Sequence, residues 1–346
     1  FCLSGGVDSG ILASIAKKKF NLNINTFSII DNDPRYNENK EISKVVDDLR
    51  CNNKKVTLKA KKKFFFKRLK TLTEYHDGPI STLSYYLHSF LSEEISRSKF
   101  KVAISGTGAD ELFSGYYEHY LHYFSDIFKE RSFNKNLRYW KQNILKLVRN
   151  PFLKDPYFYI KNRKDRSLIY EKNFNIEKFS TKKIQSSFIE KKYTTSLLRN
   201  RMLNELFHET VPIILKHDDL NSMHYSIENR SPYLDKDLFE FSCSLPSSFL
   251  INNGFQKKIL RDSSKNVLVD KVRLYKQKKG FNASLNSLVD LDKKNIDYIF
   301  NENSPISEFV DLKKARKEIN LENIPNHYSK FLFNIITTKI FLERFS

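Results

Sequence analysis

The chain has 346 residues, of which 40% are hydrophobic and 14% aromatic, and this composition indicates a globular protein and excludes a disordered one. Lysine and arginine number 60 against 40 acidic residues, but the net charge of +20 is scattered along the whole chain and indicates a compositional bias as readily as a polyanionic partner, so we expect no nucleic-acid partner. There is no apolar run of about 18 residues and no signal peptide, and the three cysteines suit neither a disulfide framework nor a zinc site, so we expect a cytoplasmic protein without a membrane span.

The first residues predict a strand followed by a helix. Phe1-Cys2-Leu3 is apolar and leads directly into Ser4-Gly5-Gly6. Because a buried strand needs more than three residues, we expect that the chain begins inside a strand and that upstream sequence is missing. The helix that follows is marked by apolar residues at helical spacing, namely Val7, Ile11, Leu12, Ile15 and Ala16.

Strands and helices alternate through the next segments. The predicted strands are Ile24 to Ile30, Lys54 to Leu58 and Val102 to Ile104. The apolar faces of the helices between them are Ile42, Val45, Val46 and Leu49, and then Leu83, Leu87, Phe90, Leu91 and Ile95. This alternation predicts an α/β fold with a parallel, twisted sheet flanked by helices. Ligands of such sheets lie beyond the carboxyl ends of the strands, where both glycine-containing loops fall.

The remainder of the chain, from about Tyr116, is predicted to be mainly helical. Residues 125 to 200 carry no recognisable motif. The polar stretch from Asn301 to Ser307 is expected to separate a final helical hairpin.

The loop Ser4-Gly5-Gly6-Val7-Asp8-Ser9 is the strongest motif. Its glycines allow a tight bend and a close approach to a ligand, and the N–H groups that open the helix favour an anion. Asp8 would repel a bare phosphate but suits Mg²⁺ that bridges phosphates. The lysine-containing Walker pattern is absent. The structural alternative is a glycine turn with Asp8 as a helix cap.

This loop resembles the pyrophosphate loop of the ATP pyrophosphatases, which cut ATP between the α- and β-phosphates. A second motif, Ser105-Gly106-Thr107-Gly108-Ala109-Asp110-Glu111-Leu112-Phe113-Ser114-Gly115-Tyr116, resembles the signature of one of these families, the asparagine synthetases. Later segments are similar to the same family: Asp218 to Met223 with Ile227 to Asp235, Lys257 with Ile259-Leu260-Arg261, and Lys278-Lys279-Gly280-Phe281. The resemblance covers residues 1 to about 285. Asp33, Tyr36, Glu38 and Asp77-Gly78-Pro79 are looser matches, and Glu228 with Arg230 could equally be a structural ion pair.

The resemblance implies the synthetase domain of an amidotransferase that uses ATP and Mg²⁺. A carboxylate, first of all that of aspartate, would attack ATP to give a β-aspartyl-AMP and pyrophosphate, and ammonia from a glutaminase domain would then form the amide. The chain could form a homodimer. Residues 1–125 would be the α/β core, similar to the adenine nucleotide alpha-hydrolases, 126–205 a helical insertion of unknown role, 206–290 the rest of the site and 291–346 the C-terminal helices, with the N-terminal glutaminase domain missing.

The resemblance also implies roles for individual residues. Lys278 would stabilise the adenylation transition state, Lys257 would be a second cation, and Asp110 and Glu111 would complete the catalytic set. Lys278 could instead be a surface lysine. The residues expected to bind the nucleotide are Ser4, Gly5, Gly6, Val7, Asp8, Ser9, Ser105 and Gly106, and those expected to hold Mg²⁺ are Asp8 and Asp110.

Two departures from the family pattern leave alternatives open. Thr107 stands where asparagine synthetases often carry an acid, so the acceptor could be another carboxylate. The glutaminase nucleophile is absent, and Cys2 is expected to be a small buried apolar residue instead. A tRNA-modifying enzyme with the same phosphate loop is the alternative from another class.

Overall fold

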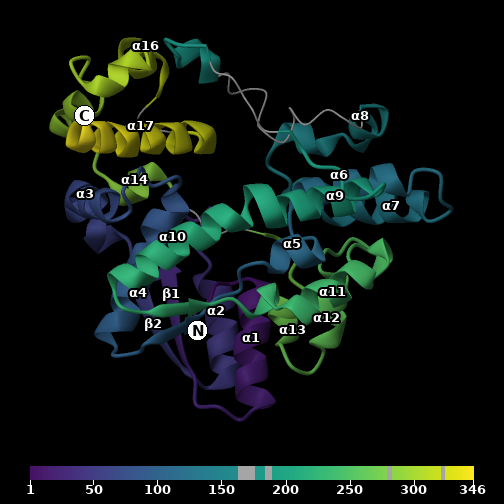
Figure 1. The fold of residues 1–346 in the computed structure, drawn as a ribbon. Coiled ribbons are helices and arrows are strands. Elements are labelled where there is room, and N and C mark those ends of the chain that lie inside the picture. The colour runs from purple at the N-terminus through teal and green to yellow at the C-terminus, as the bar shows by residue number, and fades with distance from the viewer. Residues whose placement is uncertain (163–175, 184–188, 279–282, 321–323) are drawn as a thin grey trace.

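Short parallel strands and many helices make up the structure (Figure 1). The computed structural model describes residues 1–162, 176–183, 189–278, 283–320 and 324–346. The strands are β1 (Asn25–Ile30), β2 (Asn52–Thr57), β3 (Val102–Ile104) and β4 (Glu228–Arg230). The α-helices are α1 (Val7–Lys18), α2 (Asn39–Leu49), α3 (Phe65–Tyr75), α4 (Leu83–Arg97), α5 (Ala109–Phe113), α6 (Tyr117–Asp126), α7 (Phe133–Asn143), α8 (Pro156–Lys161), α9 (Leu197–Asn204), α10 (Val211–His224), α11 (Lys236–Ser244), α12 (Lys258–Ser263), α13 (Asp270–Arg273), α14 (Leu285–Leu288), α15 (Lys293–Ile299), α16 (Leu312–Glu318) and α17 (Asn326–Phe345).

The N-terminal residues lie between two pairs of parallel strands. β1 pairs with β2, and β3 pairs with β4. The N–H group of Leu3 donates to the carbonyl of Phe27 in β1 at 2.8 Å, and the N–H group of Cys2 donates to the carbonyl of Ile104 in β3 at 2.9 Å. The parallel direction brings the carboxyl ends of these segments to a common edge, where the loops after Leu3 and Ile104 begin.

The predicted α/β class, with parallel strands and a mainly helical second half, is confirmed. The twist of one sheet between layers of helices stays a prediction. The second predicted strand begins two residues earlier than expected, at Asn52. β4 was not predicted, because its residues are polar and show no alternation. It forms by pairing with β3, which lies far away in the sequence.

Helices pack against the strands through two separate cores. One core joins Leu3 of the N-terminal segment to Ile11 of α1 and Val45 of α2. The other joins Phe27 of β1 to Leu91 of α4. The first core fixes the start of α1 beside the edge where the strands end, and the second fixes the later half of α4 against β1.

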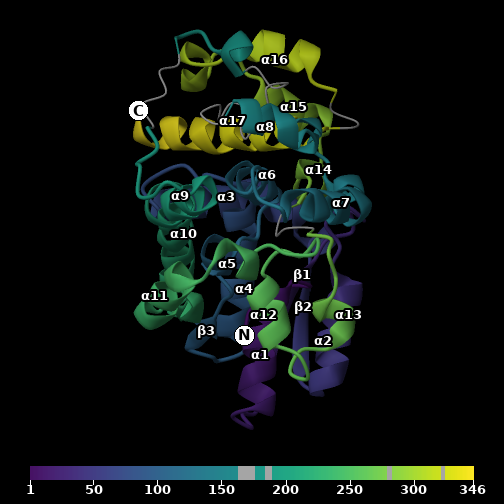
Figure 2. The same cartoon turned by 90° about the vertical axis from the view of Figure 1, so that its right-hand side faces the viewer.

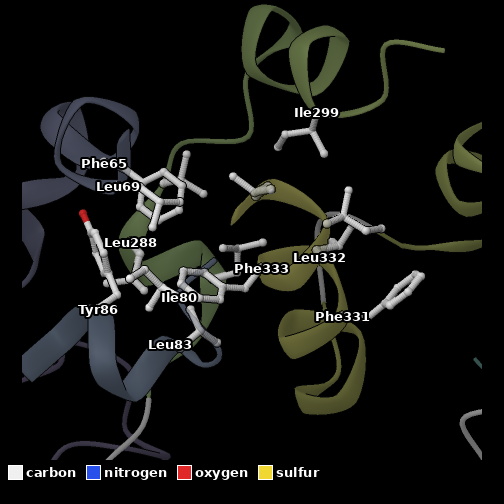
Figure 3. Packing of buried hydrophobic residues seen from close by; sticks show 14 of the residues in the cluster. Phe65, Leu69, Ile80, Leu83, Tyr86, Leu288, Ile299, Phe331, Leu332 and Phe333 are labelled. Carbon is white, nitrogen blue, oxygen red and sulfur yellow. The ribbon is translucent and has the colours of Figure 1, made fainter. Parts of the chain in front are cut away.

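The largest core joins the first third of the chain to its C-terminal residues. Phe65 of α3 and Tyr86 of α4 pack with Leu288 of α14 and Phe333 of α17 (Figure 3). Both views of the ribbon place α17 at the end of the molecule opposite α1 (Figures 1 and 2). The residues after 283 therefore close one end of the structure and anchor α3 and α4, the two helices that follow β2.

A group of helices from α5 to α9 forms another core around Trp140. After α9, a π-helical turn over Glu205–Glu209 leads into α10, which runs back toward β4 and packs against α4. No helix in the described ranges is both long and apolar enough to cross a membrane. The boundaries of the four expected segments stay a prediction, and the polar stretch after residue 301 does separate α15 from α16.

Candidate active site

A cavity of about 630 Å³ lies at the edge where the strands end. It is bounded by the two glycine-containing loops and by parts of α4, α5, α10 and the segment from 256 to 278. Every residue expected to bind nucleotide or to act in catalysis lines it: Ser4, Gly5, Gly6, Val7, Asp8, Ser9, Ser105, Gly106, Asp110, Glu111, Lys257 and Lys278. The fold thus brings together residues that are up to 274 positions apart in the sequence, from Ser4 to Lys278.

The loop from Ser4 to Ser9 is held by its own hydroxyl groups. Ser4 Oγ lies 3.1 Å from Ser9 Oγ, and the N–H group of Gly6 donates to Ser4 Oγ at 3.2 Å. The N–H group of Gly5 donates to Oε2 of Glu38 at 3.1 Å. A backbone donor of this loop therefore already binds an anionic oxygen, as expected where a helix begins.

Gly5 leaves no room for a side chain. A Cβ atom there would lie 2.7 Å from Cβ of Glu41 and 3.0 Å from Cβ of Glu38. The start of α2 thus packs directly on the loop. The side chain of Val7 is buried in the core beneath, so only its backbone is available to a ligand.

The second glycine-containing loop packs against the first. A Cβ atom at Gly106 would lie 3.2 Å from the backbone nitrogen of Ser9, so the two loops are in close contact. The hydroxyl of Ser105 donates to Oγ1 of Thr107 at 3.1 Å and lies 3.2 Å from Oγ of Ser231. Thr107 therefore places a neutral hydroxyl at the cavity where the family often has an acid.

Two lysines and two aspartates form the centre of the cavity. The Lys257 ammonium contacts the Asp8 carboxylate and lies 2.5 Å from Oδ1 of Asp110. The Lys278 ammonium lies 2.5 Å from the other oxygen, Oδ2, of Asp110. Lys257 is buried, whereas the side chain of Lys278 is 30% exposed. Lys257 thus joins the phosphate loop to α5, and Lys278 is the more accessible cation.

Gly115 leaves the space in which Asp110 and Lys257 make contact. A Cβ atom at Gly115 would lie 1.6 Å from Oδ1 of Asp110 and 2.6 Å from Cε of Lys257. Any larger residue would therefore have to displace the carboxylate or the lysine.

Opposite charges stabilise each other in this cluster. Burial alone would raise the pKa of Asp110, but the ammonium groups of Lys257 and Lys278 outweigh it and hold that pKa well below its usual value. Burial likewise disfavours the charged form of Lys257, but Asp110 and Asp8 raise its pKa above the ordinary value. Asp110 and Lys257 therefore carry opposite charges at neutral pH.

Lys278 is held in place and is not a free surface lysine. Its ammonium lies 4.1 Å from the ring centroid of Tyr116, and its backbone N–H donates to the hydroxyl of Tyr117 at 3.1 Å. The residues that follow it in the motif, Lys279, Gly280 and Phe281, lie outside the described residues.

Glu111 differs from its neighbour Asp110. Its carboxyl is buried and accepts a hydrogen bond from the Tyr116 hydroxyl. Burial, reinforced by the charge of Asp110 and of Glu205, raises the pKa of Glu111 to about 7. The adjacent acids of the second motif thus differ in charge near neutral pH.

One oxygen at the centre is suited to a metal ion. Oδ1 of Asp8 is buried and accepts no hydrogen bond among the described residues, while Oδ2 faces Lys257. Within the same ranges no cluster of three or more His, Cys, Asp or Glu side chains has the geometry of a metal site. These observations fit Mg²⁺ held by few protein oxygens together with substrate phosphates and water.

The residues that match the family pattern only loosely lie partly in the cavity and partly outside it. Glu38 lines the cavity, whereas Asp33 pairs with Arg35 outside it. Glu228 and Arg230 form a surface ion pair of 2.7 Å in β4, which confirms the structural reading of these two residues. Tyr36 and Asp77 to Pro79 do not line the cavity.

Cys2 lies under the phosphate loop, and burial raises the pKa of its thiol to about 11, so the thiol stays neutral. This agrees with a packing role and not with a nucleophile.

Sequence reasoning missed the part of the cavity wall that α4 and α10 provide. Ser84 and His88 of α4 and Asp218 of α10 line it. Ser84 and His88 are four residues apart and share a face of α4 with Leu91 and Ile95, which also line the cavity. The available signal was the presence of two polar residues on this otherwise apolar face. Asp218 belongs to a segment that resembles the family, but the sequence alone predicts no role for it.

Comparisons with known proteins agree with this site. The family model described as asparagine synthase matches residues 1–340. A curated relative, asparagine synthetase [glutamine-hydrolyzing] 1 of Bacillus subtilis (strain 168), is 24% identical over 304 residues. The alignment covers 81% of this chain and 45% of the relative, so the chain spans less than half the length of that protein.

Proposed function

The chain belongs to the asparagine synthase family, and from this premise we propose that it adenylates a carboxylate with ATP and converts it to an amide. The β- and γ-phosphates of ATP would lie on the loop from Ser4 to Ser9. The first acceptor to consider is the side-chain carboxylate of aspartate. Its attack on the α-phosphorus would release pyrophosphate and leave an acyl-adenylate, which ammonia would convert to asparagine and AMP.

The observation that carries this proposal is the chain of charges from Asp8 through Lys257 to Asp110 and Lys278. It links the phosphate loop to the acids of the second motif across one cavity. Fixed cations beside a phosphate loop can stabilise negative charge that builds on the α-phosphoryl group. No Walker lysine is present, which favours attack at the α-phosphorus over transfer of the terminal phosphate.

The protein's own residues have distinct tasks in this mechanism. Lys278, the more exposed cation, would contact the α-phosphoryl oxygens in the transition state. Lys257 would hold Asp110 of α5 close to Asp8 of the loop. The backbone N–H groups of Gly5 and Gly6 would bind phosphate oxygens, and phosphate would replace Glu38 at the Gly5 N–H group.

Mg²⁺ fits this arrangement, because Asp8 offers a buried oxygen that has no other partner among the described residues. Asp110 would be the second protein ligand. When bound, the ion would neutralise phosphate charge and orient the leaving pyrophosphate.

A different acceptor is favoured by one observation. Thr107 replaces an acid at the cavity wall and hydrogen-bonds Ser105, so this position carries no charge. An acceptor other than aspartate would explain that change. A glutaminase domain as the source of ammonia, a homodimer and a cytoplasmic location stay proposals.

Product analysis tests the proposal. The chain is incubated with ATP, Mg²⁺, aspartate and ammonium, and the phosphorus products are identified by phosphorus NMR. We expect AMP and pyrophosphate together with asparagine. Glutamine in place of ammonium serves as the control. It should give no amide, because none of the three cysteines is expected to act as a glutaminase nucleophile.

The outcomes separate the alternatives. ADP and phosphate as the main products would overturn the adenylation mechanism. If pyrophosphate appears with another carboxylate but not with aspartate, adenylation holds and the acceptor is different.

A further inference from the structure

A histidine and a carboxylate meet on the part of the cavity wall that α4 and α10 provide. Nδ1 of His88 in α4 hydrogen-bonds Oδ1 of Asp218 in α10. The side chain of Asp218 is 5% exposed and that of His88 27%, so the carboxylate is buried behind the imidazole. Both residues line the cavity that also contains Asp110 and Lys278.

The pair lies close to the catalytic acids. Tyr85, three residues before His88, lines the same cavity. Burial raises the pKa of the Tyr85 hydroxyl, and the charges of Asp218 and Glu111 raise it further. Asp218 and Glu111 are therefore both near Tyr85, and both line the same cavity as this residue.

Helix packing alone does not require this pair. The carbonyl of Tyr85 already accepts a hydrogen bond from the Asn221 amide at 2.8 Å, and the Ser96 hydroxyl donates to the carbonyl of Tyr225 at 2.9 Å. Burying a carboxylate costs free energy, and the two hydrogen bonds just named already join α4 to α10 and to the residue that follows α10. Asp218 therefore contributes little to the stability of this helix packing.

A second histidine contact on α10 provides a contrast. His217 lies 2.7 Å from the Ser81 hydroxyl, and its Nδ1 lies 3.4 Å from Nδ1 of His76. None of these three residues lines the cavity. The neighbouring pair, His88 and Asp218, does line it.

The chemistry of the pair suits proton transfer. Because Nδ1 is bound to a carboxylate, proton transfer by this imidazole would use Nε2. The carboxylate fixes the ring orientation and stabilises the imidazolium that forms when a proton is taken up. A nitrogen nucleophile that attacks an acyl carbon must lose a proton, and a base at this position could accept it.

We propose that His88 is the base that deprotonates the nitrogen nucleophile in the amide-forming step, and that Asp218 is its positioning residue. This inference rests on the proposed function. The nitrogen forms a bond to the acyl carbon, and one of its protons moves to Nε2 of His88. The bond between the acyl carbon and the AMP oxygen then breaks, and AMP leaves with the electron pair.

The test measures the two half-reactions separately in the 346-residue chain with ATP, Mg²⁺, aspartate and ammonium. His88→Gln should release pyrophosphate at close to the wild-type rate, while the amide formed per pyrophosphate falls roughly a hundredfold. Asp218→Asn should show the same split. His224→Gln is the matched control, because His224 lies on α10 like Asp218 but does not line the cavity. This variant should behave like wild type.

Chemical rescue distinguishes a base from a structural role. Added imidazole should restore part of the amide formation that His88→Gly loses, because a free imidazole can accept the proton in place of the missing side chain. The same addition should leave the amide yield of wild type unchanged.

Three outcomes would overturn the inference. An unchanged amide-to-pyrophosphate ratio in both variants would remove His88 from the reaction. No recovery of amide formation by His88→Gly with added imidazole would show that the pair shapes the cavity and does not accept a proton. A wild-type chain that releases no pyrophosphate with any carboxylate would refute the proposed function, and this inference with it.

Discussion

Lys257 and Lys278 share the carboxylate of Asp110 but differ in their surroundings. Lys257 is buried between two aspartates, whereas Lys278 reaches the cavity from a segment held by Tyr116 and Tyr117. The first is therefore suited to holding the site together, and the second to contacting a substrate. This difference leads to different expectations for their substitution.

Lys278→Ala should lower the single-turnover rate of pyrophosphate release by roughly two to three powers of ten, because a cation aimed at the transition state is lost. ATP affinity should change little. Rapid-quench kinetics and equilibrium nucleotide binding check the two quantities. Lys271→Ala, an exposed lysine of α13, is the control and should leave both unchanged. An unchanged rate in Lys278→Ala would move the role to Lys257.

The buried histidines His76 and His217 predict a pH dependence of stability. Burial lowers the pKa of each to about 4 from an ordinary 6.5. Between these values the unfolded chain binds protons that the folded chain does not, so the free energy of unfolding falls as the pH drops from about 6.5 to about 4. The expected loss is on the order of 3 kcal/mol for one histidine.

His76→Phe should remove part of this loss. Urea unfolding of wild type and variant across that pH range measures it, with His208→Gln, outside this cluster, as the control. Parallel pH profiles for wild type and His76→Phe would contradict the prediction.

At the scale of elements, α17 holds one end of the molecule together. Phe333 is fully buried, and its ring centroid lies 6.4 Å from that of Phe65 in α3 and 6.2 Å from that of Tyr86 in α4. Helices that are far apart in the sequence thus depend on the same aromatic contacts (Figure 3).

Phe333→Ala should lower the free energy of unfolding by about 3 to 5 kcal/mol, because it leaves a cavity among well-packed rings. Phe345→Ala, at the half-exposed end of the same helix, should cost less than about 1 kcal/mol. Denaturant unfolding of both variants makes the comparison. Similar losses would show that α17 contributes through its whole length and not through this core.

For the whole molecule, the net charge of +20 raises the alternative of an enzyme that acts on RNA. Scattered lysines should give only weak RNA binding that falls steeply with salt and ignores sequence. Binding of tRNA measured over a salt series checks this. Tight binding at physiological salt, together with ATP consumption that requires tRNA, would favour a tRNA-modifying enzyme instead.

The two glycine-containing loops and the acids that follow them could be predicted from the sequence alone. Gly5, Gly6 and Asp8 are neighbours along the chain, and the geometry of the proposed phosphate site arises from a strand end and a helix start. The α/β class followed from the spacing of apolar residues for the same reason, since both depend on short-range order.

Only the tertiary structure decided which distant side chains meet. Lys257 contacts Asp8 across 249 positions of sequence, and His88 meets Asp218 across 130. β4 is a strand only because β3 lies beside it. No local pattern encodes such pairings, because they result from how the cores of α4, α10 and the strands pack, and packing is a property of the whole chain.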